Sequence, residues 1–219
     1  MLHKSTQPDL RLYLVTDREL TLGRRLEWVV EEAIKGGVTF VQLREKHATT
    51  HDFLEQALAL KALLQPAGIP LVINDRLDIA MAIDADGVHL GQSDMPFREA
   101  RKMLGPDKWI GISVESLDDA LKANDMDIDY IAYSPVFETP TKRDTRQALG
   151  LNGVREIAGI TRHPSVAIGG IHPHNVASVI EAGAGGIAVV SAIMSAPDPC
   201  RAAEQLREIV DKALLIRAK

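Results

Sequence analysis

Cysteine is almost missing from this sequence. Cys200 is the single cysteine, which excludes an internal disulfide and a cysteine-rich metal site. Because Cys200 follows Pro199 at the expected start of the last helix, we interpret it as a structural residue rather than a nucleophile.

Long apolar runs are also missing. No hydrophobic stretch is long enough to span a bilayer, and residues 1–10 contain Lys4 but no apolar segment of the kind found in secretory signals. We therefore expect a cytoplasmic protein without a membrane partner. No low-complexity tract or linker divides the 219 residues, of which 46% are hydrophobic. The sequence thus predicts one soluble globular domain over residues 1–219.

A general excess of positive charge is the third absence. The formal net charge is −5 at pH 7, which argues against general nucleic-acid binding because that requires a positive field. Positive charge is instead local, at Arg44, Lys46, Lys142, Arg143 and Arg146. The expected partners are small molecules, and the sequence favours neither a monomer nor a homodimer.

The sequence does contain a repeated alternation. Eight short runs rich in Val, Ile and Leu each end in a polar residue or a glycine pair, and segments of helical period separate them. The runs are residues 12–15, 40–43, 71–73, 88–90, 109–112, 130–133, 166–168 and 187–190. Because parallel strands need crossover helices and a doubly wound sheet usually has fewer strands, the pattern predicts an α/β fold, a single (β/α)8 TIM barrel.

The helical segments carry their own start signals and buried faces. Ser116, three residues before Asp119, is an N-terminal capping signal, and Pro173 is typical of the first turn of a helix over residues 175–182. Glycines that precede strands, at 36–37, 183 and 185–186, are interpreted as helix C-caps. Three sets of residues are expected on buried faces: Leu26, Val29, Val30, Ala33 and Ile34; Leu54, Ala57 and Leu58; Val176, Val179 and Ile180.

The segment after the sixth run differs from the others. Residues 134–146 contain two prolines, three threonines and three cationic side chains. Such residues stop a strand, and the segment has too little apolar surface for a core. We interpret it as an anion-binding loop that is presented to solvent or to a ligand. A solvated surface loop is the alternative.

In such a barrel, the residues directly after the strands converge on one mouth. Asp75 and Asp94 follow the third and fourth strands and are the predicted Mg²⁺ ligands, since Mg²⁺ prefers oxygen and often retains waters and substrate phosphates. Arg44, Lys46 and Lys142 supply counter-charge for a phosphate or pyrophosphate. Taken singly, these aspartates are equally typical of caps or turns, and these cations of an ordinary surface.

Two further strand ends fit a phosphate monoester. Gly169 and Gly170 let the backbone approach a ligand after the seventh strand. Ser191 begins a short helix after the eighth, and the free N–H groups of a helix start favour an anion. A tight turn alone would also use glycine.

Other candidates for catalysis are disfavoured. His47 and His89 are interpreted as hydrogen-bonded structural groups and are left out of the site. A Schiff-base role for Lys46 or Lys142 is poorly supported, because both lie among other charges rather than in a desolvated interior.

A series of ordered motifs carries a resemblance to a known family. The motifs are residues 42–46 (QLREK), 73–76 (INDR), 86–92 (DGVHLGQ) with Asp94, Ser113, 139–142 (TPTK), 168–170 (IGG) and 190–193 (VSAI). In this order the chain resembles the thiamine phosphate synthase family from residue 12 to residue 193. The resemblance implies a Mg²⁺-dependent transferase that joins 4-amino-2-methyl-5-hydroxymethylpyrimidine diphosphate to 4-methyl-5-(2-phosphoethyl)thiazole and releases thiamine phosphate and pyrophosphate.

The same resemblance implies roles for particular residues. The pyrimidine diphosphate would be held by Gln42, Arg44, Lys46, Asn74, Ser113 and Lys142, of which Arg44, Lys46, Ser113 and Lys142 are the expected catalytic groups. The Mg²⁺ ligands would be Asp75 and Asp94. The thiazole phosphate would be held by Thr139, Pro140, Thr141, Gly170, Val190 and Ser191.

This reaction needs stabilisation of charge rather than a general base. Departing pyrophosphate needs cations and a metal to accept its developing charge. The thiazole nitrogen already carries a lone pair, and an aminopyrimidine stabilises a cation, so we expect a dissociative mechanism in which the enzyme positions the two substrates.

Two residues depart from the family pattern. Ser134 stands where glycine is usual, and Glu138 stands where proline is common. A related branch, the thiazole tautomerases, shares residues 136–139 (VFET), so a tautomerase-like isomerase is an alternative. That branch has histidine at the position of Pro135 and lacks the TPTK ending, which favours the synthase. A non-catalytic phosphate-binding regulatory paralogue is the third possibility.

Overall fold

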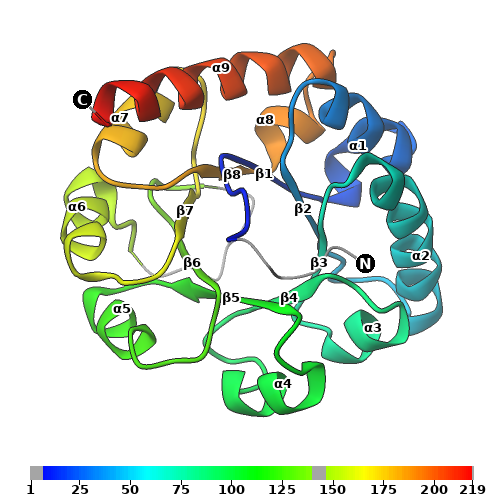
Figure 1. Ribbon diagram of the computed structural model, residues 1–219. Helices are drawn as coiled ribbons and strands as arrows, with labels where there is room; N and C mark the ends of the chain where they lie inside the picture. The colour runs from blue at the N-terminus through cyan, green and yellow to red at the C-terminus, as the bar shows by residue number, and fades with distance from the viewer. Residues whose placement is uncertain (1–6, 140–146, 219) are drawn as a thin grey trace.

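Eight parallel strands close into a barrel (Figure 1). The computed structural model describes residues 7–139 and 147–218. Its strands pair in sequence order, and β8 returns to pair with β1. The strands are β1 (Leu12–Val15), β2 (Phe40–Leu43), β3 (Leu71–Asn74), β4 (Gly87–Leu90), β5 (Trp109–Val114), β6 (Tyr130–Tyr133), β7 (Ser165–Ile168) and β8 (Ile187–Val189). The predicted (β/α)8 barrel is confirmed.

Helices form a ring around the outside of this barrel (Figure 1). They are η1 (Arg18–Thr21), α1 (Leu26–Lys35), α2 (Thr50–Ala67), α3 (Leu77–Ala82), α4 (Phe97–Leu104), α5 (Leu117–Ala123), α6 (Gly150–Ile160), α7 (Val176–Glu181), α8 (Ser191–Met194) and α9 (Pro199–Arg217). Within the described residues, no helix combines the length and apolar character needed to cross a membrane.

Side-chain caps begin several of these helices. The side chains of Thr49, Ser116 and Asp198 each accept a hydrogen bond from the backbone N–H three residues later, at the starts of α2, α5 and α9. The predicted cap at Ser116 is therefore confirmed. Cys200 lies in the first turn of α9, as the sequence predicts.

Two helix predictions are wrong in detail. The buried face of α2 contains Phe53, Ala57, Leu60 and Leu64, whereas Leu58 is 49% exposed. This buried face is rotated relative to the predicted one, because the large Phe53, rather than Leu54, takes the core position. Pro173 lies in a turn before α7, which begins at Val176. That turn is closed by a hydrogen bond from Asn175 N to His172 O.

The base of the barrel is filled by aromatic side chains. Because side chains alternate along a strand, Tyr13, Phe40 and Tyr130 point into the barrel, while Leu12 and Leu14 pack in the outer cluster. The ring centroids of Tyr13 and Phe40 are 4.7 Å apart, and those of Phe40 and Tyr130 are 5.8 Å apart. These rings fill the interior below the carboxyl-terminal ends of the strands and leave those ends for cavities.

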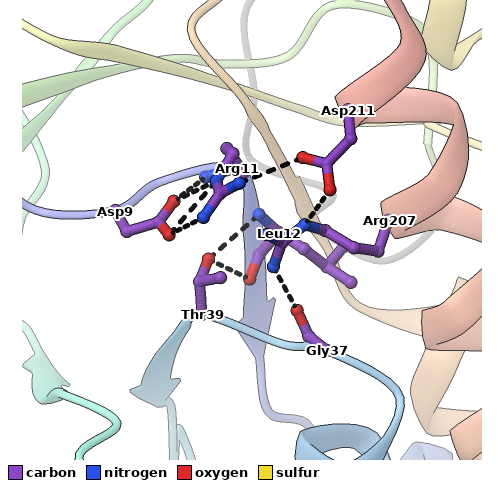
Figure 2. A network of polar contacts seen from close by, with 7 residues as sticks. All are labelled: Asp9, Arg11, Leu12, Gly37, Thr39, Arg207 and Asp211. Carbon is purple, nitrogen blue, oxygen red and sulfur yellow. Dashed lines mark hydrogen bonds and ion pairs between the residues drawn. The ribbon is translucent and has the colours of Figure 1, made fainter.

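A polar network fastens the start of β1 to its surroundings (Figure 2). Arg11 Nη2 lies 2.6 Å from Asp9 Oδ2, and Arg11 Nη1 lies 3.3 Å from Asp211 Oδ1 of α9. Thr39 Oγ1 accepts a hydrogen bond from Leu12 N and donates one to Leu12 O, at 3.1 and 3.0 Å. The network joins β1 to α9 and to the segment that leads into β2.

One glycine pair has a different role from the predicted one. A side chain at Gly186 would overlap the carbonyl oxygen of Leu10, and a Cβ at Gly185 would lie 2.7 Å from Ser165 O. The C-cap interpretation of residues 185–186 is therefore wrong. These glycines are needed because neighbouring backbone approaches them closely.

Candidate active site

Two adjoining cavities open at the carboxyl-terminal ends of the strands. The first has a volume of about 260 Å³ and is lined mainly by residues that end or follow β6, β7 and β8. The second, of about 350 Å³, is lined by residues that end or follow β2, β3, β4 and β5. Arg44, Asn74, His89 and Ser113 line both cavities. The two cavities are therefore parts of one site.

Asp75 and Asp94 meet in the second cavity. Burial is the largest cause that raises the pKa of Asp75, to about 6. The hydrogen bond with Asp94 and the charge of Asp94 raise it further, while the positive charge of Lys46 opposes the rise. Asp94 Oδ2 accepts a hydrogen bond of 2.6 Å from Gly91 N, which orients its carboxylate. The structure thus brings together the two carboxylates that the sequence predicts as metal ligands.

The backbone holds Asp75 in an uncommon conformation. Its φ is +60°, in the left-handed region that few residues other than glycine, asparagine and aspartate adopt. Asp75 N donates a 2.9 Å hydrogen bond to His89 O on β4, which links the end of β3 to its neighbour. Local strain of this kind is typical of functional positions.

These residues fit a magnesium ion. Two adjacent, partly buried carboxylates repel one another when both are ionised, and a divalent cation between them removes that repulsion. No cluster of three or more His, Cys, Asp or Glu side chains suited to a metal occurs in the part of the chain that the structure describes. Mg²⁺ commonly takes one or two carboxylates and completes its shell with waters and substrate phosphates, so the pair is sufficient.

Two of the three predicted counter-charges lie at the same mouth. Arg44 and Lys46 line the second cavity, and Arg44 also lines the first. Arg44 N donates to Thr16 Oγ1 at 3.1 Å, and its Nη1 lies 3.6 Å from Asp17 Oδ2. Arg44 therefore enters the cavities from a fixed backbone. Lys142, Pro140 and Thr141, together with Arg143 and Arg146, lie outside the described residues.

The predicted phosphate-binding residues gather in the first cavity. Thr139, Gly170, Val190 and Ser191 line it together. Thr139 ends the described part of the segment after β6, Gly170 follows β7, and Ser191 begins α8 directly after β8. The structure thus brings together hydroxyl groups and backbone from three consecutive strand ends.

The glycine pair after β7 has a second reason beyond approach to a ligand. Gly169 and Gly170 have φ values of +105° and +62°. A Cβ on Gly169 would lie 2.7 Å from Pro135 Cβ, and one on Gly170 would lie 2.8 Å from Glu138 O. The pair is therefore needed so that the segment after β6 can lie against it and border the cavity.

The start of that segment lines the first cavity through Ser134 and Pro135, but it is also more buried than the sequence predicts. Ser134 is 5% exposed, and Val136 is fully buried in the outer core. Val136 N donates to Ile168 O at 2.8 Å, and Phe137 N donates to Gly169 O at 3.1 Å. The prediction that this segment has too little apolar surface for a core is wrong for Val136, because backbone pairing with β7 continues beyond the end of β6.

A chain of hydrogen bonds crosses the barrel beneath the cavities. Gln42 Nε2 donates to Tyr13 Oη at 2.6 Å, and the hydroxyls of Tyr13 and Tyr130 are 2.9 Å apart. Tyr130 Oη lies 3.1 Å from His89 Nδ1, and His89 Nε2 lies 3.0 Å from Ser113 Oγ. Gln42 and Ser113 line the cavities at the two ends of this chain.

Sequence reasoning missed part of this arrangement. The sequence indicates a structural role for His89, and no pattern singles out Tyr13 or Tyr130, because a tyrosine within an apolar run resembles ordinary core. Their inward positions on strands close to Gln42 and His89 are the signal that could have identified them. Gln92, which donates to Ser113 O at 2.5 Å, and His172, which lines the first cavity, were also missed.

Another cavity lies at the opposite end of the barrel. It has a volume of about 410 Å³ and is lined by residues that include Lys61, Asp84 and Lys108. Lys108 Nζ lies 2.6 Å from Asp84 Oδ1, so these charges already satisfy one another. Reactions in this fold take place at the carboxyl-terminal ends of the strands, which points to the two adjoining cavities instead.

The fold and the position of the cavities define a class, the (β/α)8 barrel enzymes whose reaction takes place at the carboxyl-terminal mouth. Residues 12–193 match the family described as thiamine monophosphate synthase. The chain belongs to this family and is a transferase. The resemblance found in the sequence is thereby confirmed.

Individual relatives agree with this assignment. The thiamine-phosphate synthase of Albidiferax ferrireducens is 57% identical over 202 residues, which cover 92% of each chain. That of Vibrio parahaemolyticus is 48% identical over 201 residues, which cover 92% of this chain and 98% of the relative. The solved structure of a thiamine phosphate pyrophosphorylase from Pyrococcus furiosus is 40% identical, with a TM-score of 0.86 and coverage of 94% and 98%. These relatives give no support to the isomerase or the non-catalytic alternative.

Proposed function

We propose that this chain joins 4-amino-2-methyl-5-hydroxymethylpyrimidine diphosphate to 4-methyl-5-(2-phosphoethyl)thiazole and releases thiamine phosphate and pyrophosphate. The observation that carries the proposal is the union of the two cavities through Arg44, Asn74 and Ser113. A diphosphate ester in one cavity and a phosphate-bearing acceptor in the other would lie side by side. A cytoplasmic location, as expected from the sequence, is part of the same proposal.

The second cavity would bind the pyrimidine diphosphate. Arg44 and Lys46 would meet its phosphates, with Lys142 from outside the described residues, and Asn74 would lie between the two cavities. Gln42 and Ser113 would orient the pyrimidine ring at the junction. Oriented binding of this kind lowers the barrier because it supplies the geometry of reaction in advance.

Asp75 and Asp94 would hold Mg²⁺ in this cavity. When bound, the ion neutralises charge on the departing pyrophosphate. The adjacency of the two carboxylates and the raised pKa of Asp75 support this assignment, because a divalent cation relieves their repulsion.

The first cavity would bind the thiazole phosphate. Thr139, Gly170, Val190 and Ser191 would contact it, with Pro140 and Thr141 from outside the described residues. Hydroxyl and backbone N–H groups after the seventh and eighth strands are a common phosphate site in this fold. The thiazole nitrogen would then face the pyrimidine methylene carbon.

The proposed chemistry breaks one bond and forms one. The carbon–oxygen bond between the pyrimidine methylene and pyrophosphate breaks, and the oxygen keeps the electron pair. The thiazole nitrogen then donates its lone pair to the same carbon. Side chains at the mouth have to position the reactants and stabilise charge, and no proton has to be removed before the new bond forms.

A direct test incubates the purified chain with both substrates, with and without Mg²⁺. Thiamine phosphate and pyrophosphate should appear in equal amounts, and a chelator of divalent metals should abolish both. Failure to form thiamine phosphate would contradict the proposal. Conversion of a thiazole tautomer without the pyrimidine substrate would support the isomerase alternative, and phosphate binding without turnover the non-catalytic one.

A further inference from the structure

We propose that Tyr13, Tyr130 and His89 are positioning residues that fix the hydrogen-bonding direction of Gln42 and Ser113, so that the site selects an aminopyrimidine over its oxo counterpart. The inference rests on the proposed function and deepens it. It names the edge of the pyrimidine that the site recognises and the residues that determine this recognition.

The chain of hydrogen bonds is continuous and buried. Its four contacts are between 2.6 and 3.1 Å long. Tyr13 and Tyr130 are 1% and 0% exposed, and His89 is 6% exposed. Burial raises the pKa of both tyrosines, so each hydroxyl stays protonated and contributes one hydrogen to the chain.

The number of hydrogens on each group determines which atom donates and which accepts in each hydrogen bond. Gln42 Nε2 can only donate, so Tyr13 Oη accepts from it. Among the described residues, Tyr130 Oη is the remaining hydrogen-bond partner of Tyr13 Oη and must take the hydrogen of Tyr13. Tyr130 then donates to His89 Nδ1.

The last link follows from the histidine tautomer. A neutral imidazole that accepts at Nδ1 carries its hydrogen on Nε2, so His89 donates to Ser113 Oγ. With the opposite direction and the same Gln42 amide, the hydrogen of Tyr13 would be buried without an acceptor, which is strongly unfavourable.

This direction decides what the two ends offer to a ligand. Ser113 Oγ already accepts from His89, so its own hydrogen is available for donation. Gln42 uses one hydrogen of Nε2 for the chain, and Oε1 is the one acceptor of its side chain.

One acceptor beside one donor matches the amino group and the adjacent ring nitrogen of an aminopyrimidine. The oxo counterpart presents a carbonyl oxygen and a ring N–H at these places, so it is mismatched at both. To accept it, the Gln42 amide and all four hydrogen bonds would have to reverse together. The cost of that joint reversal is the proposed source of selectivity.

The first test uses a pair of matched tyrosines on β6. Tyr130→Phe removes the central hydroxyl and keeps the ring that packs on Phe40. Tyr133→Phe is the control, since Tyr133 is also buried but faces the outer core and takes no part in the chain. The measurement is the dissociation constant, without thiazole phosphate, of the aminopyrimidine diphosphate and of its oxo counterpart.

We expect Tyr130→Phe to reduce the preference for the amino form by roughly tenfold or more, because the two ends are no longer coupled. Affinity for the thiazole phosphate should not change, and Tyr133→Phe should preserve the preference. A preference in Tyr130→Phe within about twofold of wild type would overturn the inference, as would an equal loss in both variants.

A second measurement needs no turnover and is made on the wild-type protein. Nitrogen NMR of histidine-labelled wild-type protein reports which ring nitrogen of His89 carries hydrogen, and the signals are assigned by their loss in His89→Gln. We expect hydrogen on Nε2 and none on Nδ1, and the reverse would overturn the inference. If no thiamine phosphate forms but this tautomer is found, the proposed function is wrong, while the direction of the hydrogen bonds is supported. If thiamine phosphate forms and the tautomer is reversed, the inference fails alone.

Discussion

Replacement of Asp75 by asparagine should make the metal-free protein more stable and nearly inactive. Burial, and then the hydrogen bond and charge of Asp94, raise the pKa of Asp75 from 3.8 to about 6. An acid whose pKa is higher in the folded state holds its proton more tightly there, so its ionisation destabilises the fold. This loss of stability develops between about pH 4 and pH 6 as the pH rises, and it is complete at neutral pH.

The size of the effect follows from the same values. A pKa difference of about two corresponds to at most about 3 kcal/mol. Because the carboxyl is partly exposed to solvent and is coupled to Asp94, we expect about 1 kcal/mol. Asparagine has nearly the same shape and tolerates the φ of +60° at this position. The melting temperature of the metal-free protein at pH 7 should therefore rise by about 2–4 °C.

Activity should change in the opposite direction. Loss of one metal ligand should lower kcat/KM by about 10²-fold or more, the scale for removal of one preorganised electrostatic partner. Asp78→Asn is the control, because Asp78 lies on α3, is paired with Arg76 and has a lowered pKa. It should retain activity and should not raise the melting temperature.

The measurements are thermal unfolding in chelator at pH 4 and pH 7, and steady-state rates over a range of Mg²⁺ concentrations. A lower melting temperature of metal-free Asp75→Asn at pH 7 would refute the argument that the burial of ionised Asp75 beside Asp94 destabilises the fold. Wild-type rates and metal dependence in both Asp75→Asn and Asp94→Asn would refute the metal assignment.

Three further variants test separate parts of the account. Lys142→Ala should lower kcat by about 10²-fold or more if Lys142 meets charge on the leaving group. A change in KM alone in steady-state kinetics would mean that Lys142 binds the substrate and the transition state equally well. Gly170→Ala should raise KM for the thiazole phosphate and leave KM for the pyrimidine unchanged, because a Cβ there would press on Glu138 O; equal increases in both KM values would count against it. Thr39→Val should lower the free energy of unfolding by about 1–3 kcal/mol in denaturant titrations, because Leu12 N loses its acceptor, and a change in kcat would contradict its purely structural role.

The barrel could be predicted because its pattern is local. Strand ends such as Leu43 and Tyr133 follow directly from short apolar runs, and each run needs only its own residues to be recognised. The strand-end rule then places Asp75 near Asp94 without any knowledge of side-chain contacts. Both are properties of the backbone topology, which the alternation of strands and helices already determines.

The rest depends on contacts between distant residues. Val136 resembles part of a polar loop in the sequence and becomes core only because its N–H pairs with Ile168 on β7. The roles of Tyr13 and His89 depend on their meeting Tyr130 across the barrel, which no local pattern shows. Likewise, the exclusion of a side chain at Gly186 comes from Leu10, far away in the chain.

In the proposed mechanism, the site stabilises charge as pyrophosphate departs, before the new carbon–nitrogen bond forms. The most direct test is the single-turnover rate of thiamine phosphate formation from a pyrimidine diphosphate whose 2-methyl group is replaced by trifluoromethyl. That group withdraws electrons and destabilises the pyrimidine cation, so the rate should be lower by several orders of magnitude with little change in binding. A rate within about tenfold of that of the normal substrate, which is about 1.4 kcal/mol in the barrier, would contradict departure of pyrophosphate before the new bond forms.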